Sequence, residues 1–293
     1  MEVFYFMQTH LDCIPCFLHQ ALEASRMATE DEKKHEEVMI NVMKQLQQID
    51  FHLSPPEISQ HVHHIIRTIT DNPDPYQLVK QEANIDAQKQ YQTLKKMISE
   101  SNDPLLLAVK LAIIGNVIDF GTMNRMNITE MIENFNQKEF DKTHYTKFKE
   151  RIHNAENIVY LADNTGEIFF DRILLEQLQG KNRHITYVVK QHPIINDATI
   201  DDALFADIDE YADIIAGDKG TAYSGPGMIL SNISHQLKDL LDHADVVISK
   251  GQGNYESLSD FNREIFFLLM VKCPLVASSI GIDVGTMVLK VKP

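Results

Sequence analysis

Residues 158–167 read IVYLADNTGE, and this stretch decides the fold of the chain. Its first five residues are apolar and include β-branched side chains, which predicts a buried strand. The polar residues after them lead into a helical pattern in which Phe170, Leu174 and Leu178 recur at every fourth position. A buried strand followed by a polar turn and an amphipathic helix is typical of a parallel sheet covered by helices.

The same alternation of short apolar runs and amphipathic segments continues to the C-terminus. Five strands are predicted, over residues 158–162, 185–189, 213–216, 246–249 and 275–277. We therefore expect an α/β domain over residues 157–293, with a mainly parallel sheet flanked by helices.

The first half of the chain predicts helices instead of strands. Val38, Val42 and Leu46 are spaced as on one helical face, and two prolines at 55 and 56 interrupt the pattern. Helical patterns then cover residues 57–70, 76–100 and 104–120. These patterns predict an all-helical N-terminal domain over residues 1–120 and a helical connector over residues 121–156.

The composition is that of an ordinary globular protein, with 44% hydrophobic and 24% charged residues over 293 positions. The net charge of −15 opposes attraction to phosphate backbones, so we expect no nucleic-acid partner. No run of about eighteen apolar residues occurs, so we expect no membrane span. The N-terminus lacks the basic segment of a secretory signal, which predicts a cytoplasmic protein.

The turn after the first predicted strand carries Asp163 and Asn164. Ligands of parallel sheets bind beyond the carboxyl ends of the strands, and a carboxylate beside an amide oxygen suits Mg²⁺ or Mn²⁺. Alternatively, Asp163 or Asn164 caps the following helix, and Glu167 completes a capping box from Asn164. This segment alone leaves both interpretations open.

Two later turns fall at the same edge of the predicted sheet. Asp197 follows the second strand and can supply a second carboxylate to the same metal, or it can cap a helix. Residues 250–254 (KGQGN) follow the fourth strand and combine a lysine, two glycines and a following helix, which can cradle a phosphate. Binding of a dinucleotide is not favoured, because Glu256 replaces the third glycine of that fingerprint.

Two further segments allow a structural and a functional interpretation. Asn116 and Asp119 end the last predicted N-terminal helix, where they serve either as local caps or as a roof over the cleft. Cys13 and Cys16 have the C-x-x-C spacing of redox or zinc sites, but no strand precedes them and nothing nominates further ligands. We interpret the two cysteines as structural or incidental.

Taken together and in this order, the segments of the chain resemble the DUF89 family, also called the damage-control phosphatases. The resemblance is closest to an archaeal and bacterial branch with an N-terminal C-x-x-C. The motifs are C-x-x-C at 13–16, DPY at 74–76, GNVIDF at 115–120, DNTGE at 163–167, PIINDAT at 193–199, KGQGN at 250–254 and KC at 272–273.

The resemblance implies a Rossmann-like α/β domain that carries a divalent metal, which is Mg²⁺, Mn²⁺, Co²⁺ or Ni²⁺. It implies that the metal is held by Asp163, Asn164 and Asp197. It also implies that the phosphate or sugar is held by Lys250, Gly251, Gln252, Gly253, Asn254 and Lys272, and that Asn116, Asp119 and Glu167 flank the cleft.

The sequence thus predicts a metal-dependent phosphatase acting on small phosphate esters, such as sugar phosphates or damaged phosphometabolites. Asp163 and Lys250 are the predicted catalytic residues, with Lys250 stabilising charge in the transition state. The nucleophile is a water molecule or, less favoured, the Asp163 carboxylate. The alternatives are a carboxyl methyltransferase-like enzyme and a non-catalytic protein that binds a metal or a phosphometabolite.

Overall fold

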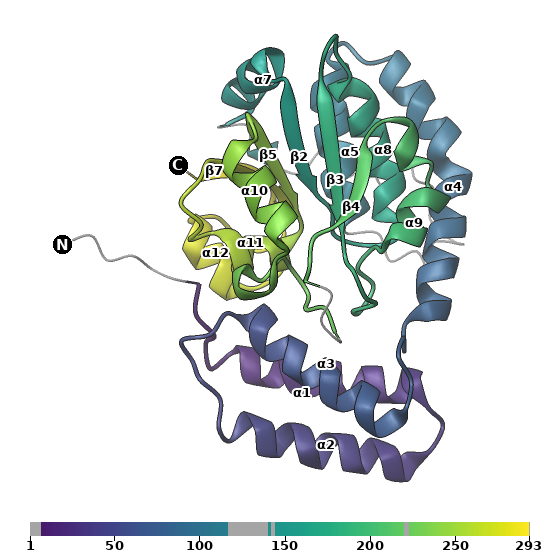
Figure 1. Cartoon of the computed structure of the whole chain (residues 1–293), viewed down its shortest axis with the longest axis vertical. Helices are drawn as coiled ribbons and strands as arrows, with labels where there is room; N and C mark the ends of the chain where they lie inside the picture. The colour runs from purple at the N-terminus through teal and green to yellow at the C-terminus, as the bar shows by residue number, and fades with distance from the viewer. Residues whose placement is uncertain (1–6, 117–139, 142–143, 220–222, 293) are drawn as a thin grey trace, which may run out of the picture.

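The computed structural model describes residues 7–116, 140–141, 144–219 and 223–292. A mainly parallel sheet with helices on both faces forms the larger part, and a three-helix unit lies at one edge of this sheet (Figure 1). This arrangement confirms the predicted α/β fold class. In the described ranges, no helix is long and apolar enough to cross a membrane.

Within the described residues, the sheet has seven strands in the order β1-β7-β6-β5-β2-β3-β4. Their bounds are Phe140–Asp141 for β1, Asn157–Leu161 for β2, His184–Val189 for β3, Asp213–Ala216 for β4, Val246–Lys250 for β5, Ile265–Met270 for β6 and Met287–Lys292 for β7. All pairs are parallel except β6 with β7. The chain runs outward from β2 through β3 to β4 and then returns to β5 on the other side of β2, which makes a topological switch point between β2 and β5.

Four of the five predicted strands are confirmed within about two residues at each end. The fifth prediction, residues 275–277, is wrong because these residues belong to helix α12 (Pro274–Ile280). Cys273 is extended and acts as the N-cap, and Pro274 occupies the first helical turn, where its missing N–H costs nothing. The strands β1, β6 and β7 are absent from the prediction, and β1 lies within residues 121–156, which are predicted to be helical.

Each face of the sheet has its own hydrophobic core. Helices α4 (Gln77–Ser99), α5 (Pro104–Gly115), α7 (Tyr145–Asn154), α8 (Glu167–Leu178) and α9 (Ile200–Phe205) pack on one face. The other face carries α10 (His235–His243), α11 (Gln252–Leu258) and α12. Within β2, Ile158 and Tyr160 point into the first core, whereas Val159 and Leu161 point into the second, as the period of a strand requires.

Helices α4 and α5 share the core of the sheet, although the sequence groups them with the N-terminal helices. Leu94 of α4 and Ala112 of α5 are fully buried in the core that also holds Tyr160 and Phe170. The domain limits at residues 120 and 156 stay predictions, because residues 117–139 and 142–143 of the connector lie outside the described ranges.

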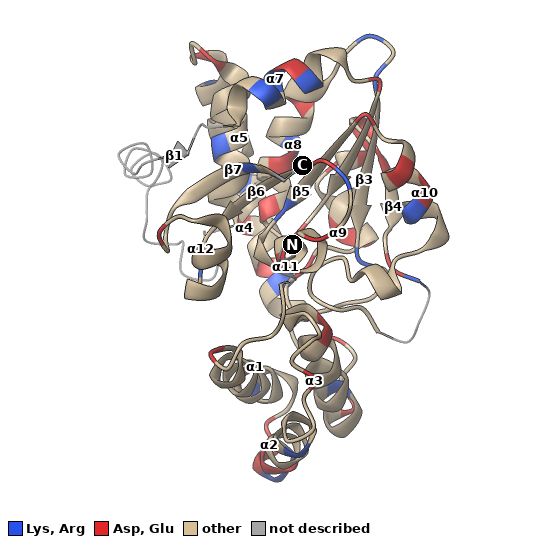
Figure 2. Ribbon diagram, turned by 90° about the vertical axis from the view of Figure 1, so that its left-hand side faces the viewer, with Lys and Arg blue, Asp and Glu red and all other residues tan. Residues whose placement is uncertain are grey.

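The separate three-helix unit consists of α1 (Cys13–Ala28), α2 (Glu32–Leu46) and α3 (Pro55–Thr70). Phe17, Val38 and Ile66 lie in its small core. Figure 2 shows the unit below the carboxyl edge of the sheet, with α1 and α3 closest to it. On α3, Arg67 Nη1 donates to the Pro193 carbonyl oxygen over 2.7 Å, which ties the unit to the turn after β3.

A cluster of buried charges lies between the sheet and α8. Lys250 Nζ is 2.5 Å from both Glu167 Oε1 and Asp171 Oδ1, and all three side chains are fully buried. Tyr160 and Tyr187 donate their hydroxyls to the two oxygens of Asp171 over 2.7 and 2.8 Å. Burial would lower the pKa of Lys250, but the charges of Asp171 and Glu167 raise it, so the lysine carries its proton.

Replacing Lys250 with methionine should strongly destabilise the fold, because two carboxylates would remain buried without a cation. We expect the free energy of unfolding to fall by about 3–5 kcal/mol in urea denaturation. Lys89→Met is the control, because Lys89 forms an exposed pair with Asp86 at 2.6 Å and should cost less than about 1 kcal/mol. Equal losses in the two variants would contradict a structural role for the buried cluster.

Candidate active site

A cavity of about 400 Å³ lies between the three-helix unit and the carboxyl edge of the sheet. Helices α1 and α3 form one wall, and the turns after β2, β3, β5 and β6 form the other. The predicted site residues that line it are Asn116, Asp163, Asn164, Asp197, Gln252, Gly253 and Lys272. The cavity is therefore at the switch point, where this type of sheet binds its ligands.

Backbone hydrogen bonds join the turns after β2 and β3. The Ala198 N–H donates to the Asp163 carbonyl oxygen over 2.8 Å, and the Thr165 N–H donates to the Asn196 carbonyl oxygen over 2.8 Å. Asn164 and Asp197 also form an isolated antiparallel bridge. The three predicted metal ligands consequently lie side by side, although more than thirty residues separate Asp163 from Asp197.

Amide groups surround the carboxylate of Asp163. Its Oδ2 accepts hydrogen bonds from Asn116 Nδ2 and, over 2.9 Å, from Asn164 Nδ2. Asn116 Nδ2 also donates to Glu167 Oε2 over 2.7 Å. Burial, together with the charges of Glu167 and Asp197, raises the pKa of Asp163 well above its ordinary value. A buried carboxylate with two other acids beside it is stabilised by any positive charge that binds next to it.

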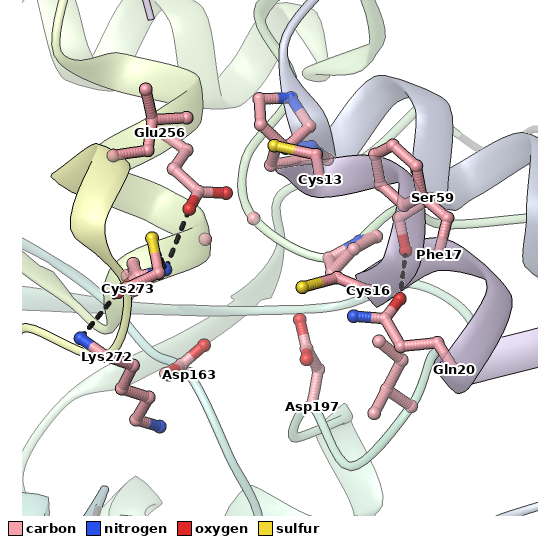
Figure 3. A pocket seen from close by; sticks show the side chains of 18 of the residues that line it. Cys13, Cys16, Phe17, Gln20, Ser59, Asp163, Asp197, Glu256, Lys272 and Cys273 are labelled. Atoms are coloured by element: carbon pink, nitrogen blue, oxygen red, sulfur yellow. Dashed lines mark hydrogen bonds between the residues drawn. The ribbon is translucent and has the colours of Figure 1, made fainter. Parts of the chain in front are cut away.

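The alternative that Asp163 or Asn164 caps the following helix agrees only in part with the structure of the turn after β2. Gly166 is the N-cap of α8 and offers no side chain, so neither Asp163 nor Asn164 occupies the cap position. Glu167 Oε2 does accept from the Asn164 backbone N–H over 3.3 Å, which resembles half of a capping box. Asp163 is left to face the cavity, where Figure 3 shows its carboxylate near that of Asp197.

The oxygen atoms at this edge fit a divalent cation. Asp197 Oδ2 and Asn116 Oδ1 are buried and have no hydrogen-bond partner, although Lys190 Nζ lies 3.5 Å from Asp197 Oδ2. Buried oxygen atoms without partners are costly, and carboxylate and amide oxygens are the ligands that Mg²⁺ prefers. The set combines two carboxylates with amides; among the described residues, no group of three or more His, Cys, Asp or Glu side chains is arranged as a metal site.

Gly251 allows the Asp163 carboxylate to approach the turn after β5. Gly251 has a φ of +78°, and a Cβ built on it would lie 1.9 Å from Asp163 Oδ2. Both the left-handed backbone and the contact exclude other residues here. The sequence predicts Gly251 as a phosphate-binding residue, whereas in the structure its lack of a side chain makes room for a predicted metal ligand.

Five predicted residues lie outside the cavity lining or outside the described ranges, and Gly251, whose backbone lies against Asp163, is one of them. Lys250 and Glu167 belong to the buried charge cluster beneath it. Asn254 is fully buried and supports the turns, since its Oδ1 accepts from the Met228 N–H and its Nδ2 donates to the Ala162 carbonyl oxygen. Asp119 lies outside the described residues. The roles predicted for these residues stay predictions.

Lys272 is the one described residue with a positive side chain that lines the cavity. Its Nζ donates to the Asn116 carbonyl oxygen over 3.1 Å, so the amine lies close to the end of α5. Gln252 and Gly253 line the cavity at the first turn of α11, where backbone N–H groups have no acceptor within the helix. An anion that enters this cavity can meet an amine and free N–H groups together.

Several lining residues are not among those predicted. Cys13, Cys16 and Gln20 reach the cavity from α1, and Cys273 and Glu256 reach it from the opposite wall (Figure 3). The interpretation of the C-x-x-C pair as structural or incidental did not place it at this cavity. Only the packing of α1 against the sheet edge brings Cys13, Cys16 and Gln20 to the site, and no local sequence pattern encodes that packing.

Comparison with known proteins decides the family. Residues 9–288 match the model of the damage-control phosphatase ARMT1-like domain. The chain belongs to this family. A protein named damage-control phosphatase from Archaeoglobus fulgidus is 33% identical over 95% of this chain and 97% of its own length. Another protein of that name, from Pyrococcus horikoshii, is 32% identical over 96% of this chain and 97% of its own length.

A solved structure agrees with membership of the damage-control phosphatase family. The 2.04 Å crystal structure of a DUF89 family protein from Pyrococcus horikoshii superposes with a TM-score of 0.87 at 32% identity. The match covers 97% of this chain and 98% of that chain. The family predicted from the order of the motifs is thus confirmed, whereas the branch with the N-terminal C-x-x-C stays a prediction.

Gly251→Ala should displace the Asp163 carboxylate and weaken the binding of Mn²⁺, as measured by isothermal titration calorimetry. Gly281→Ala is a matched control, because Gly281 has a φ of +81° but an added Cβ meets nothing within 4 Å. The control should lose about 1 kcal/mol of unfolding free energy from backbone strain and keep its affinity for Mn²⁺. Unchanged Mn²⁺ affinity in Gly251→Ala would show that the contact with Asp163 does not matter.

Glu256→Gln should stabilise the protein at pH 8. Burial raises the pKa of Glu256 to about 7 from an ordinary value of 4.5, so the folded state retains a proton that the unfolded chain has released. The free energy of unfolding therefore falls as the pH rises from 4.5 to about 7. Above this range Glu256 is ionised in both states, and the full cost of burying its charge lowers the stability. We expect the variant to gain on the order of 1 kcal/mol at pH 8 and little at pH 4.

Urea denaturation at the two pH values measures this gain. The control is Glu30→Gln, which changes an exposed carboxylate in the same way. A gain for Glu256→Gln that is the same at pH 4 and pH 8 would contradict the raised pKa.

Proposed function

We propose that this protein is a divalent-metal-dependent phosphatase that hydrolyses phosphate monoesters of small metabolites, such as sugar phosphates or damaged phosphometabolites. The observation that carries the proposal is the convergence of Asp163, Asn164 and Asp197 on one cavity that also contains Lys272. Two relatives that bear the name damage-control phosphatase, each at least 32% identical, support the same activity.

The metal would be held by Asp163, Asn164 and Asp197, and we infer Mg²⁺, Mn²⁺, Co²⁺ or Ni²⁺ in this position. When bound, it supplies charge neutralisation for the phosphoryl oxygens. Asn116 adds a buried oxygen atom without a hydrogen-bond partner next to this set. A ligand set of carboxylate and amide oxygens suits Mg²⁺ and Mn²⁺ best among these four ions.

Lys272 and the first turn of α11 are suited to hold the phosphate group. The Lys272 amine lines the cavity, and the N–H groups at Gln252 and Gly253 belong to a helical turn without internal acceptors. Fixed donors of this kind stabilise negative charge that develops as the phosphate ester breaks. The sequence gives the phosphate contact to both Lys250 and Lys272, and we keep it for Lys272 alone, because Lys250 is fully buried in the charge cluster.

Lys250 contributes from beneath the cavity in this proposal. Its amine holds Glu167, and Glu167 in turn accepts hydrogen bonds from the amides of Asn116 and Asn164. These amides position the Asp163 carboxylate through their bonds to Oδ2. Lys250 is thus a positioning residue, since it orients two amides that contact Asp163.

A water molecule is the favoured nucleophile. In this proposal the Asp163 carboxylate serves as a metal ligand, and its Oδ2 already accepts hydrogen bonds from two amides, which leaves the attack on phosphorus to water. We also propose that the protein acts in the cytoplasm and belongs to the family branch with an N-terminal C-x-x-C. The hydrolysis mechanism depends on neither of these two proposals. A phosphoenzyme trapped on Asp163 would contradict the assignment of water.

Asp163→Ala should reduce phosphate release by about a thousandfold or more, because the variant lacks one metal carboxylate. The assay measures inorganic phosphate from a panel of sugar phosphates with each of the four ions and with a chelator. The control is Asp213→Ala, because Asp213 begins β4 at the opposite edge of the sheet and is exposed. Asp213→Ala should keep the parent rate.

Three outcomes would contradict the proposal. Parent-rate hydrolysis by Asp163→Ala would exclude this carboxylate from the site. Activity that persists in chelator would exclude the metal and would favour the transferase alternative. Stoichiometric binding of phosphate esters without turnover across the panel would favour a non-catalytic binding protein.

A further inference from the structure

Three thiols line the cavity, and neither the charge cluster nor the proposed hydrolysis uses them. Cys13 and Cys16 lie on the first turn of α1, and Cys273 caps α12 on the opposite wall (Figure 3). Cys16 is exposed, whereas Cys13 and Cys273 are half-buried, and all three are free cysteines. Small molecules that enter the cavity therefore pass three free thiols.

We propose that Cys13 and Cys16 form a dithiol that small-molecule disulfides oxidise to an internal disulfide, and that this reaction clears thiol adducts from the cavity mouth. The reacting partners are disulfides of low molecular weight, of the chemical class of oxidised glutathione. Cys273 takes no part in the pair. The inference stands on the thiols alone and does not depend on the proposed phosphatase activity.

The helical position of the pair suits a disulfide. Residues three apart in an α-helix lie on the same face, with Cα atoms about 5 Å apart from the helix radius and rise. Disulfides usually join Cα atoms about 4.4–6.8 Å apart, so Cys13 and Cys16 can be bridged without unwinding α1. Pro15 lies between them in the first turn, where its fixed φ matches the helical conformation.

The two cysteines differ in accessibility, which sets the order of reaction. Cys16 is exposed, and its thiol donates to the Asp12 carbonyl oxygen over 3.8 Å. Cys13 is half-buried, and burial raises the pKa of its thiol. Because attack requires both access and a thiolate, Cys16 reacts first and Cys13 second.

The reaction balances in two thiol exchange steps. The Cys16 thiolate attacks one sulfur of the small disulfide, which forms a mixed disulfide and releases one small thiol. The Cys13 thiolate then attacks the Cys16 sulfur, which forms the internal disulfide and releases the second small thiol. The two protons lost by the cysteines end on the two released thiols, and the small disulfide is the oxidant.

The surroundings of Cys273 differ from those of Cys13 and Cys16. Its sulfur accepts a hydrogen bond from Gln252 Nε2 over 3.4 Å, and its backbone is extended at the start of α12. The charge of Cys273 also acts on the Cys13 thiol across the cavity, so Cys273 is the competing partner from which the test must distinguish the pair. A mixed disulfide on Cys16 without the neighbouring Cys13 would instead persist and occupy the cavity mouth.

The test uses the full-length reduced protein, oxidised glutathione as the probe, alkylation of the remaining thiols and intact-mass measurement. The wild type should fall from three alkylatable cysteines to one and retain no glutathione. Cys13→Ser should accumulate one glutathione on Cys16. Cys273→Ser should still lose both thiols of the pair, and peptide mapping should find the bond between Cys13 and Cys16.

Three results would overturn the proposal. The wild-type protein could keep all three thiols after treatment, or it could end with glutathione still attached. Peptide mapping could also find a disulfide that includes Cys273. The wild-type result alone is decisive, so the test does not require that every serine variant folds. Because the readout is mass, a failure to find phosphatase activity would leave this result unaffected.

Discussion

The buried amine of Lys250 is the charge on which the rest of the site depends. Two carboxylates, Glu167 and Asp171, meet it at 2.5 Å beneath the sheet edge, where the desolvation of three charges is offset by short ion pairs and tyrosine hydroxyls. With Glu167 neutralised from below, its other oxygen is available to accept from two asparagine amides above. The floor of the cavity is therefore a fixed polar network that leads from the core to Asp163.

The parallel topology concentrates polar turns at one place. The turn after β2 is hydrogen-bonded to the turn after β3, and Gly251 after β5 lets the Asp163 carboxylate lie against its backbone. The connections after β2 and β5 leave the sheet in opposite directions at this switch point, and a crevice remains between them. The polar turns line this crevice. The three-helix unit covers the crevice and converts it into a cavity whose second wall carries thiols and an amide.

Much of this arrangement could be predicted from the sequence. The short apolar runs before Asp163 and Lys190 identify β2 and β3, and the rule for parallel sheets then places the following turns together. The sequence could not show that the Lys250 amine points into the core, because a lysine at the end of a strand fits a buried pair and a ligand contact equally well. It also could not assign α12, because residues 275–277 are apolar and the extended Cys273 before Pro274 resembles the end of a strand.

The three-helix unit is joined to the sheet by a small number of polar contacts. Arg67 reaches the Pro193 carbonyl oxygen, Gln60 Nε2 donates to the Tyr223 carbonyl oxygen over 3.4 Å, and His64 stacks on the Tyr223 ring at 4.3 Å. Its small core is separate from both cores of the sheet, although Ile195 from the turn after β3 packs against it. A molecule bound in the cavity contacts both walls, so its binding adds contacts between the three-helix unit and the sheet. Ligand binding in this cavity would therefore stabilise both parts of the chain together and not one wall alone.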